Sequence, residues 1–62
     1  MNYFLKTGDR VRHKDENFDK KLGIMTILAI KGEYATCESF DYDKFGSNLE
    51  TFRMQDLKLA EN

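Results

Sequence analysis

The sequence predicts a small all-β domain made of short antiparallel strands. Three observations lead to this fold class: apolar and polar residues alternate in short runs, turn-forming residues separate the runs, and the chain leaves no room for a parallel crossover. The 62 residues include no proline, so every residue of each run can donate a backbone hydrogen bond to a sheet. We therefore expect residues 1–62 to form one domain, with Phe4 or Leu5 packed on it.

The strongest strand signal lies in the middle of the chain, at residues 22–30 and 34–40. The first run is almost entirely apolar, and its three isoleucines suit a pleated strand better than a helix because their side chains branch at Cβ. The second run alternates, which places Ala35 and Cys37 on one face. Gly32 lies between the runs and can supply the positive φ angle of a tight turn. A β-hairpin is expected here.

Three further strands are expected around this hairpin. They lie at residues 10–14, 49–53 and 57–59. Alternation in the first of them puts Val11 and His13 on one face. Polar and turn-forming residues predict loops at 15–21 and 41–48, and a single tight helical turn is expected at 54–56. In the second loop, Gly46 and Asn48 are suited to left-handed backbone geometry.

A strongly bent, antiparallel five-stranded SH3-like barrel is the natural way for strands this short to enclose a core. The predicted inward residues are Val11, Met25, Ile27, Ile30, Ala35, Cys37, Phe52, Leu57 and Leu59. Met25 and Ile27 share the parity of one strand face, whereas Ile30 does not. A β-bulge or sharp bend is therefore expected near residues 28–29.

Composition narrows the class of protein. The net charge is only −1, with seven Lys or Arg against four Asp or Glu in residues 1–31 and three against seven in residues 32–62. A single cysteine excludes an internal disulfide, and the sequence shows no zinc-ligand spacing. No apolar run approaches the roughly 20 residues needed to span a bilayer. We expect a cytoplasmic protein without a cofactor, a metal or a membrane partner.

Several motifs extend over nearly the whole chain. They are Gly8-Asp9-x-Val11, Gly23-x-Met25-Thr26-Ile27-x-x-Ile30-x-Gly32, Ala35-x-Cys37-x-x-Phe40-Asp41, and Glu50-Thr51-Phe52 followed by Leu57. Together they resemble the YodC-like family of small uncharacterised bacterial proteins. The chain departs from that pattern at residues 15–22, where the family usually has a Ser-Gly-Gly-Pro loop, and at Ser39, where it has a tryptophan. The resemblance implies an SH3-like barrel and brings no established activity.

An aromatic cluster is the leading candidate for a binding surface. Its members are Tyr34, Phe40, Tyr42 and Phe45. Alternation points Tyr34 and Phe40 away from the core face. Two interpretations stay open: an exposed groove for a protein partner, or packing in a second small core or a homodimer contact. Glu38, Asp41 and Asp43 lie beside these aromatic residues and favour a cationic partner.

A basic set supports an alternative function. Arg10, Arg12 and Lys14 share one strand face, and Lys20 and Lys21 follow in the next loop. Lysine and arginine side chains that neutralise phosphates dominate affinity for nucleic acids. The chain as a whole is slightly acidic, however, and this favours the interpretation that these residues form a solvated outer face.

The remaining reactive side chains do not predict catalysis. Cys37 occupies an inward position typical of an inert core residue. His13 is the only histidine, and no nucleophile can be placed beside it, so a partly buried strand residue is expected. A barrel this small leaves little concave space for a substrate. The sequence thus favours a non-catalytic module that binds a protein; a nucleic-acid-binding barrel and a homodimeric structural protein are the alternatives.

Overall fold

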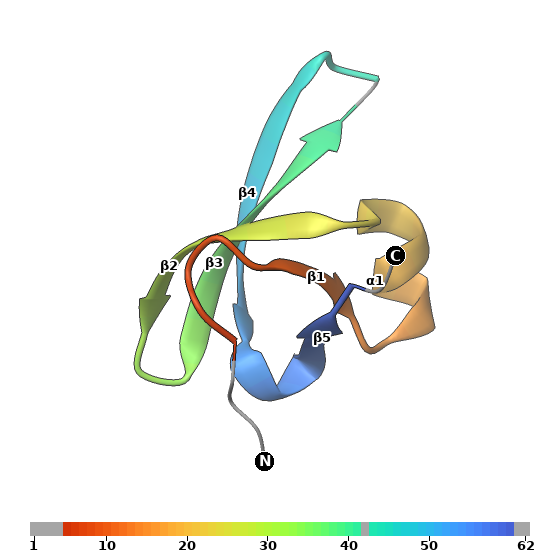
Figure 1. The fold of residues 1–62 in the computed structure, drawn as a ribbon. Helices are drawn as coiled ribbons and strands as arrows, with labels where there is room; N and C mark the ends of the chain where they lie inside the picture. The colour runs from red at the N-terminus through yellow and green to blue at the C-terminus, as the bar shows by residue number, and fades with distance from the viewer. Residues whose placement is uncertain (1–4, 42, 61–62) are drawn as a thin grey trace.

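The computed structural model describes residues 5–41 and 43–60 and consists of one antiparallel sheet with a short helix beside it. The elements in chain order are β1 (Arg10–His13), α1 (Glu16–Leu22), β2 (Met25–Lys31), β3 (Tyr34–Asp41), β4 (Gly46–Arg53), the 3-10 turn η1 (Met54–Asp56) and β5 (Leu57–Leu59). The strands lie in the order β4-β3-β2-β1-β5 (Figure 1). The predicted all-β fold class is confirmed. Within the described residues no ladder joins β4 to β5, so closure of the sheet into an SH3-like barrel stays a prediction.

The central hairpin has the predicted form. Lys31 pairs with Tyr34, which leaves a two-residue turn whose first residue, Gly32, has a φ angle of 57°. A positive φ is what such a turn requires, and glycine adopts it at low cost because it has no Cβ. The register between β2 and β3 shifts between Ile27 and Ala29, so the predicted bulge is also confirmed. It allows residues on either side of the shift to face the same core.

The second hairpin is much longer than expected. β3 and β4 pair without a register shift from Tyr34 opposite Arg53 to Asp41 opposite Gly46. The prediction of a loop over 41–48 is therefore wrong for all but the tip, and the strand predicted at 49–53 starts three residues earlier, at Gly46. The outer end of this hairpin projects away from β1 and β5 (Figure 1). One face of that end is therefore open to other molecules, and the other face is opposite α1 alone.

Side-chain hydrogen bonds explain why the second hairpin turns so tightly. The carboxylate of Asp41 accepts hydrogen bonds from the backbone N–H of Asp43, at 2.9 Å, and of Lys44, at 3.4 Å. Such a local bond replaces a backbone partner and stabilises a turn. The left-handed residue is Phe45, with a φ angle of 52°. Gly46 does not have a positive φ, which corrects the expectation for this part of the turn.

Residues 15–21 were expected to be a loop, and the structure corrects this with helix α1. Asp15 caps its first turn by accepting a hydrogen bond from the backbone N–H of Asn17 at 2.8 Å. Gly23 ends the helix with a φ angle of 66° and donates its N–H to the carbonyl of Asp19. These are the preferred residue types at the two ends of a helix. Seven residues are marginal alone, so packing on the sheet must stabilise α1.

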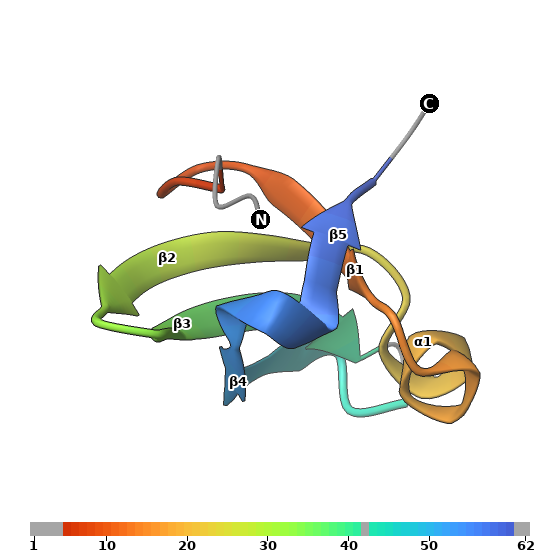
Figure 2. The same ribbon diagram turned by 90° about the horizontal axis from the view of Figure 1, so that it is seen from below.

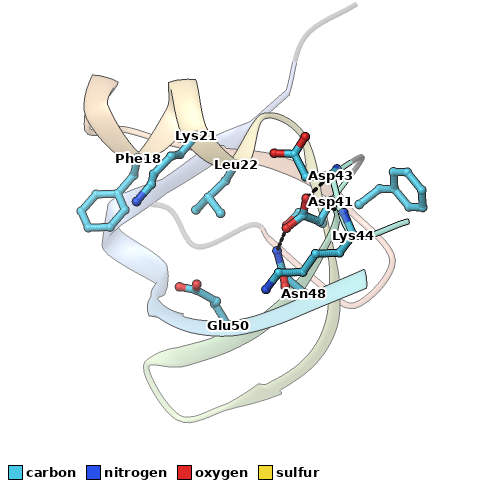
Figure 3. A pocket seen from close by; sticks show the side chains of 10 residues that line it. Phe18, Lys21, Leu22, Asp41, Asp43, Lys44, Asn48 and Glu50 are labelled. Carbon is cyan, nitrogen blue, oxygen red and sulfur yellow. Dashed lines mark hydrogen bonds between the residues drawn. The ribbon is translucent and has the colours of Figure 1, made fainter. Parts of the chain in front are cut away.

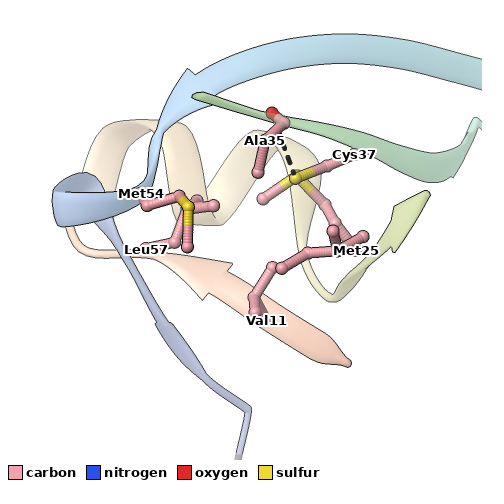
Figure 4. Packing of buried hydrophobic residues seen from close by; sticks show 7 residues of the cluster. Val11, Met25, Ala35, Cys37, Met54 and Leu57 are labelled. Atoms are coloured by element: carbon pink, nitrogen blue, oxygen red, sulfur yellow. Dashed lines mark hydrogen bonds between the residues drawn. The ribbon is translucent and has the colours of Figure 1, made fainter. Parts of the chain in front are cut away.

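The core lies between the bent halves of the sheet and agrees with most of the predicted residues. The buried apolar side chains are Val11, Met25, Ile27, Ala35, Cys37, Met54 and Leu57 (Figure 4). Ile30 and Phe52 are partly buried against this cluster, as is Leu5, whereas Phe4 lies outside the described residues. Leu59 is wrong: it is 52% exposed, because it lies at the end of edge strand β5, beyond the enclosed space.

Helix α1 lies beside the end of β1 (Figure 2), and a cluster of aromatic rings packs it against the sheet. The ring centroid of His13 lies 4.7 Å from that of Phe18 and 4.9 Å from that of Phe52. His13 is only 7% exposed, and its Nδ1 accepts the backbone N–H of Asp15 at 2.9 Å. One imidazole therefore contacts the helix, the strand β4 and the residue that caps the helix.

Candidate interaction surface

The face of the hairpins opposite the core carries four exposed apolar side chains near one another. We call them the outer patch: Ile24, Phe40, Phe45 and Leu49. Phe40 and Ile24 line one shallow hollow of ≈ 360 Å³. The rings of Phe40 and Phe45 meet edge to face with centroids 6.5 Å apart. Leu49 joins them diagonally, because Phe40 pairs with Ser47, two residues before Leu49.

Two charged residues lie among these apolar side chains. Glu38 is half-buried and occupies the middle of the face, with Thr26 opposite it on one side and Leu49 on the other. Arg10 pairs with Thr26 and lines the same hollow as Glu38. The outer patch is thus an apolar surface with one carboxylate near its centre and one guanidinium at the side of β1.

The structure divides the aromatic cluster predicted from the sequence. Phe40 and Phe45 lie together, but Tyr34 lies at the opposite end of β3, about 20 Å from Phe40 at the usual rise per residue. There Tyr34 pairs with Arg53, and its hydrogen bond to the guanidinium raises the pKa of Arg53. Tyr42 falls outside the described residues. Phe40 and Tyr34 do point away from the core, as predicted, and are 50% and 46% exposed.

Two members of the outer patch were missed by sequence reasoning. The apolar run at 22–30 includes Ile24 in a buried strand, whereas β2 begins only at Met25. The strand predicted at 49–53 assigns no face to Leu49, whereas its pairing with Glu38 puts it on the outer face. Its alternation with Asn48 and Glu50 was a signal that could have been followed, once β4 is known to begin at Gly46.

The basic residues predicted as an alternative site are not gathered on one surface. Arg12 is committed to an ion pair, with its Nε 3.0 Å from Oδ1 of Asp19. Lys21 lines a groove on the inner side of the β3–β4 hairpin, whereas Arg10 lies by the outer patch. Lys14 and Lys20 are exposed. The set thus faces at least two directions.

The groove on the inner side is the largest hollow that we describe, at ≈ 580 Å³. It separates α1 from the outer half of the hairpin (Figure 3). Its lining residues are Phe18, Lys21, Leu22, Ser39, Phe40, Asp41, Asp43, Lys44, Asn48 and Glu50. The side chain of Asn48 donates to Asp41 at 3.3 Å, and this bond is the main reason that the pKa of Asp41 lies below its usual value. Two lysines oppose three carboxylates here, so the groove offers little net attraction to a charged ligand.

The single cysteine and the single histidine are both buried in the interior. Cys37 is buried, its Sγ lies 3.8 Å from the carbonyl oxygen of Ala35, and burial raises the pKa of its thiol. A raised pKa keeps the sulfur in the less nucleophilic thiol form. His13 uses Nδ1 as an acceptor from Asp15 and packs against the rings of Phe18 and Phe52. Neither group faces a described hollow.

Within residues 5–41 and 43–60, no group of three or more His, Cys, Asp or Glu side chains could hold a metal ion. Nor does that part contain a helix with the length and apolar character to cross a membrane. The chain matches no protein-family model, no curated protein and no solved structure at a significant level. Its resemblance to the YodC-like family therefore stays a prediction.

Proposed function

We propose that this protein is a non-catalytic interaction module that binds another protein through the outer patch. The patch combines large apolar side chains with a defined backbone scaffold, since three of its four residues belong to the β3–β4 hairpin or its turn. Exposed apolar clusters on a small domain are typical of protein-binding surfaces. The buried positions of His13 and Cys37 support a role that does not involve catalysis.

One observation carries the proposal: Phe45 is 83% exposed while its φ angle is 52°. A bulky residue in the left-handed region is strained, and glycine or asparagine would fit the same turn at lower cost. Such strain, in a residue whose side chain contributes little to the core, is typical of positions selected for contact with another molecule. A phenylalanine at the tip of a projecting hairpin is well placed for that contact.

The charge at the centre of the patch suggests the chemistry of the partner. Glu38 is half-buried among Ile24, Leu49 and Thr26, so docking of an apolar surface would remove more water from its carboxylate. A desolvated carboxylate needs a compensating donor. The partner segment should therefore present apolar side chains together with one lysine or arginine that reaches Glu38.

The test combines photo-cross-linking with a matched pair of variants. A photo-reactive phenylalanine analogue at position 45, in the host cell, should give a discrete adduct with another protein. Phe40→Ala should abolish this adduct, whereas Tyr34→Ala should leave it, because both residues are half-exposed aromatics on the same face of β3 but at opposite ends. No discrete adduct with a different protein, or such an adduct that survives Phe40→Ala, contradicts the proposal; an adduct between two copies of this chain is counted separately.

Nucleic acid is the alternative candidate for the partner of this protein. The basic side chains face different directions and Arg12 is paired with Asp19, which favours a protein instead. Labelled single-stranded and duplex oligonucleotides should show no tight binding at low salt. Affinity that falls steeply with salt, and that Arg10→Glu weakens, would indicate a nucleic-acid-binding barrel.

A further inference from the structure

β4 is an edge strand with little to prevent it from pairing again. It pairs only with β3 among the described strands, over eight residues and without a bulge. Natural edge strands are usually protected by proline, a bulge, an inward charge or a covering segment. β4 has no proline. Its inward charge is Glu50, opposite Cys37 of β3, so an added strand must present a hydrogen-bond donor to this carboxylate. It is therefore a suitable template for strand addition.

One backbone hydrogen bond shows which N–H and C=O groups of β4 point to its open edge. Met54 donates its backbone N–H to the carbonyl of Glu33, on the side of β3. Because successive residues of a strand direct these groups to opposite sides, the even-numbered residues of β4 serve β3. The odd-numbered residues Ser47, Leu49 and Thr51 direct their N–H and C=O groups to the open edge.

From this geometry we propose that β4 pairs antiparallel with β4 of a second copy, about a two-fold axis at Leu49. In this register the two Leu49 residues face each other, and Ser47 faces Thr51 of the other copy. Each of these pairs can exchange two backbone hydrogen bonds. The result is a continuous sheet across two copies, and it joins their outer patches through Leu49.

The side chains on both faces are complementary in this register. On the outer face, the two Leu49 side chains meet across the axis and form an apolar pair. On the inner face, Asn48 comes opposite Glu50, where an amide can donate to a carboxylate. The stretch from residue 47 to residue 51 is thus self-complementary about its midpoint.

Neighbouring registers are less favourable. Only odd-numbered residues direct hydrogen-bonding groups to the open edge, so hydrogen-bonded pairs must join an odd-numbered residue of each copy. The smallest shifts that keep this rule move the two-fold axis to residue 48 or to residue 50. An axis at Glu50 places the two Glu50 carboxylates directly opposite each other, which is destabilising. An axis at Asn48 places Leu49 opposite Ser47 and Glu50 opposite Gly46, so the apolar pair and the amide–carboxylate pair are both lost. Charge and apolar matching thus select Leu49.

Disulfide cross-linking tests the register. Two residues in a hydrogen-bonded antiparallel pair have Cα atoms about 5.5 Å apart, a separation that a disulfide can bridge. Leu49→Cys should therefore give a covalent dimer on mild oxidation, seen on a non-reducing gel. Leu59→Cys is the control, because Leu59 is a similarly exposed leucine on the other edge strand, at 52% against 61% for Leu49. The native Cys37 is buried and does not compete. Equal or faster cross-linking of Leu59→Cys would overturn the proposal.

Sedimentation velocity tests the association itself. The wild-type protein should pass from monomer to dimer as concentration rises, and Thr51→Pro should weaken this at least tenfold, since it removes an N–H that faces only the open edge. Leu49→Lys, an exposed substitution that leaves the core intact, should act the same way. Phe40→Ala should not change the association, which separates this inference from the proposed function. A wild-type protein that stays monomeric up to millimolar concentration would refute the pairing.

Discussion

The imidazole of His13 meets the ring of Phe52 edge to face, with 4.9 Å between their centroids. The same imidazole packs against Phe18, with 4.7 Å between centroids, and its Nδ1 accepts the backbone N–H of Asp15. Phe18 also contacts Phe52, so the three rings form one cluster. His13 therefore connects β1 with β4 and with the start of α1. His13 is a polar residue in an alternating strand, and it is also a central packing residue of this fold.

Substitution of His13 should separate packing from hydrogen bonding. His13→Ala removes both ring contacts and the acceptor, and should cost about 3 kcal/mol in the free energy of unfolding. His13→Phe keeps a ring but leaves the N–H of Asp15 without its acceptor, for a cost of about 1 kcal/mol. Urea unfolding followed by circular dichroism measures both. Equal losses in the two variants would mean that the hydrogen bond, not packing, is the main contribution.

The two hairpin glycines should respond to alanine with opposite signs. Gly32 has a φ angle of 57° with no atom within 4 Å of an added Cβ, so Gly32→Ala should destabilise by about 1 kcal/mol through backbone strain alone. Gly46 has no positive φ, and an added Cβ would make an ordinary 3.8 Å contact with the carbonyl oxygen of Lys44. Gly46→Ala should stabilise by about 0.5 kcal/mol. Thermal unfolding of both variants provides the measurement, and a destabilised Gly46→Ala would show that the second turn needs glycine.

Phe45→Asn should weaken partner binding and raise the free energy of unfolding. Asparagine tolerates left-handed geometry, so relief of strain should outweigh the lost edge contact with Phe40 and raise the free energy of unfolding by roughly 0.5–1 kcal/mol. The same variant should lose the partner adduct expected at the outer patch. Chemical denaturation gives the stability. A loss of more than about 1 kcal/mol would instead identify Phe45 as a packing residue.

Acid should loosen the tip of the second hairpin through Asp41. Hydrogen bonds from the Asn48 side chain, and then from the backbone of Asp43 and Lys44, hold the pKa of Asp41 below its usual value of 3.8. For a group whose folded pKa is depressed, the stabilisation is complete above the unfolded pKa and is lost as pH falls through the folded pKa. The effect therefore belongs to the range below pH 3.8. Titration of the Asp41 carboxyl carbon by NMR should place its midpoint there.

The control for this titration is Asp41→Asn, in which the amide shifts of Asp43 and Lys44 should no longer respond to acid in step with a neighbouring carboxyl group. A midpoint for Asp41 at or above its ordinary value would contradict the hydrogen bonds seen at the turn. In that case the tight closure of the β3–β4 hairpin would need another cause, such as the strained backbone of Phe45.

Local pattern was sufficient for the central hairpin. β-branching and alternation act on neighbouring residues, and Gly32 closes the turn without help from distant parts of the chain. Parity also located the bulge, because Met25 and Ile30 can face one core only if the register shifts between them. The same reasoning placed Val11, Ala35 and Cys37 in the interior. These inferences needed only two rules: side chains alternate between the two faces of a strand, and apolar side chains prefer the interior.

Helix α1 and the extent of β4 were missed because their stability is not local. Seven polar-rich residues form a helix here since Phe18 packs on His13 and Phe52, and no short window of sequence contains both Phe18 and Phe52. The cap at Asp15 and the four-residue spacing of Phe18 and Leu22 were visible signals, but each is weak alone. Likewise, β4 reaches Gly46 because β3 provides its partner along the whole length.

Sequence alone determined that this chain is an antiparallel all-β protein whose central hairpin turns at Gly32. The reason is that strand propensity and turn chemistry are properties of adjacent residues. Tertiary structure decided which exposed side chains share a surface. It separated Tyr34 from Phe40, brought Ile24 and Leu49 to the outer patch, and paired Arg12 with Asp19. Pairing register and the bend of the sheet set those distances, and both depend on contacts between residues far apart in the chain.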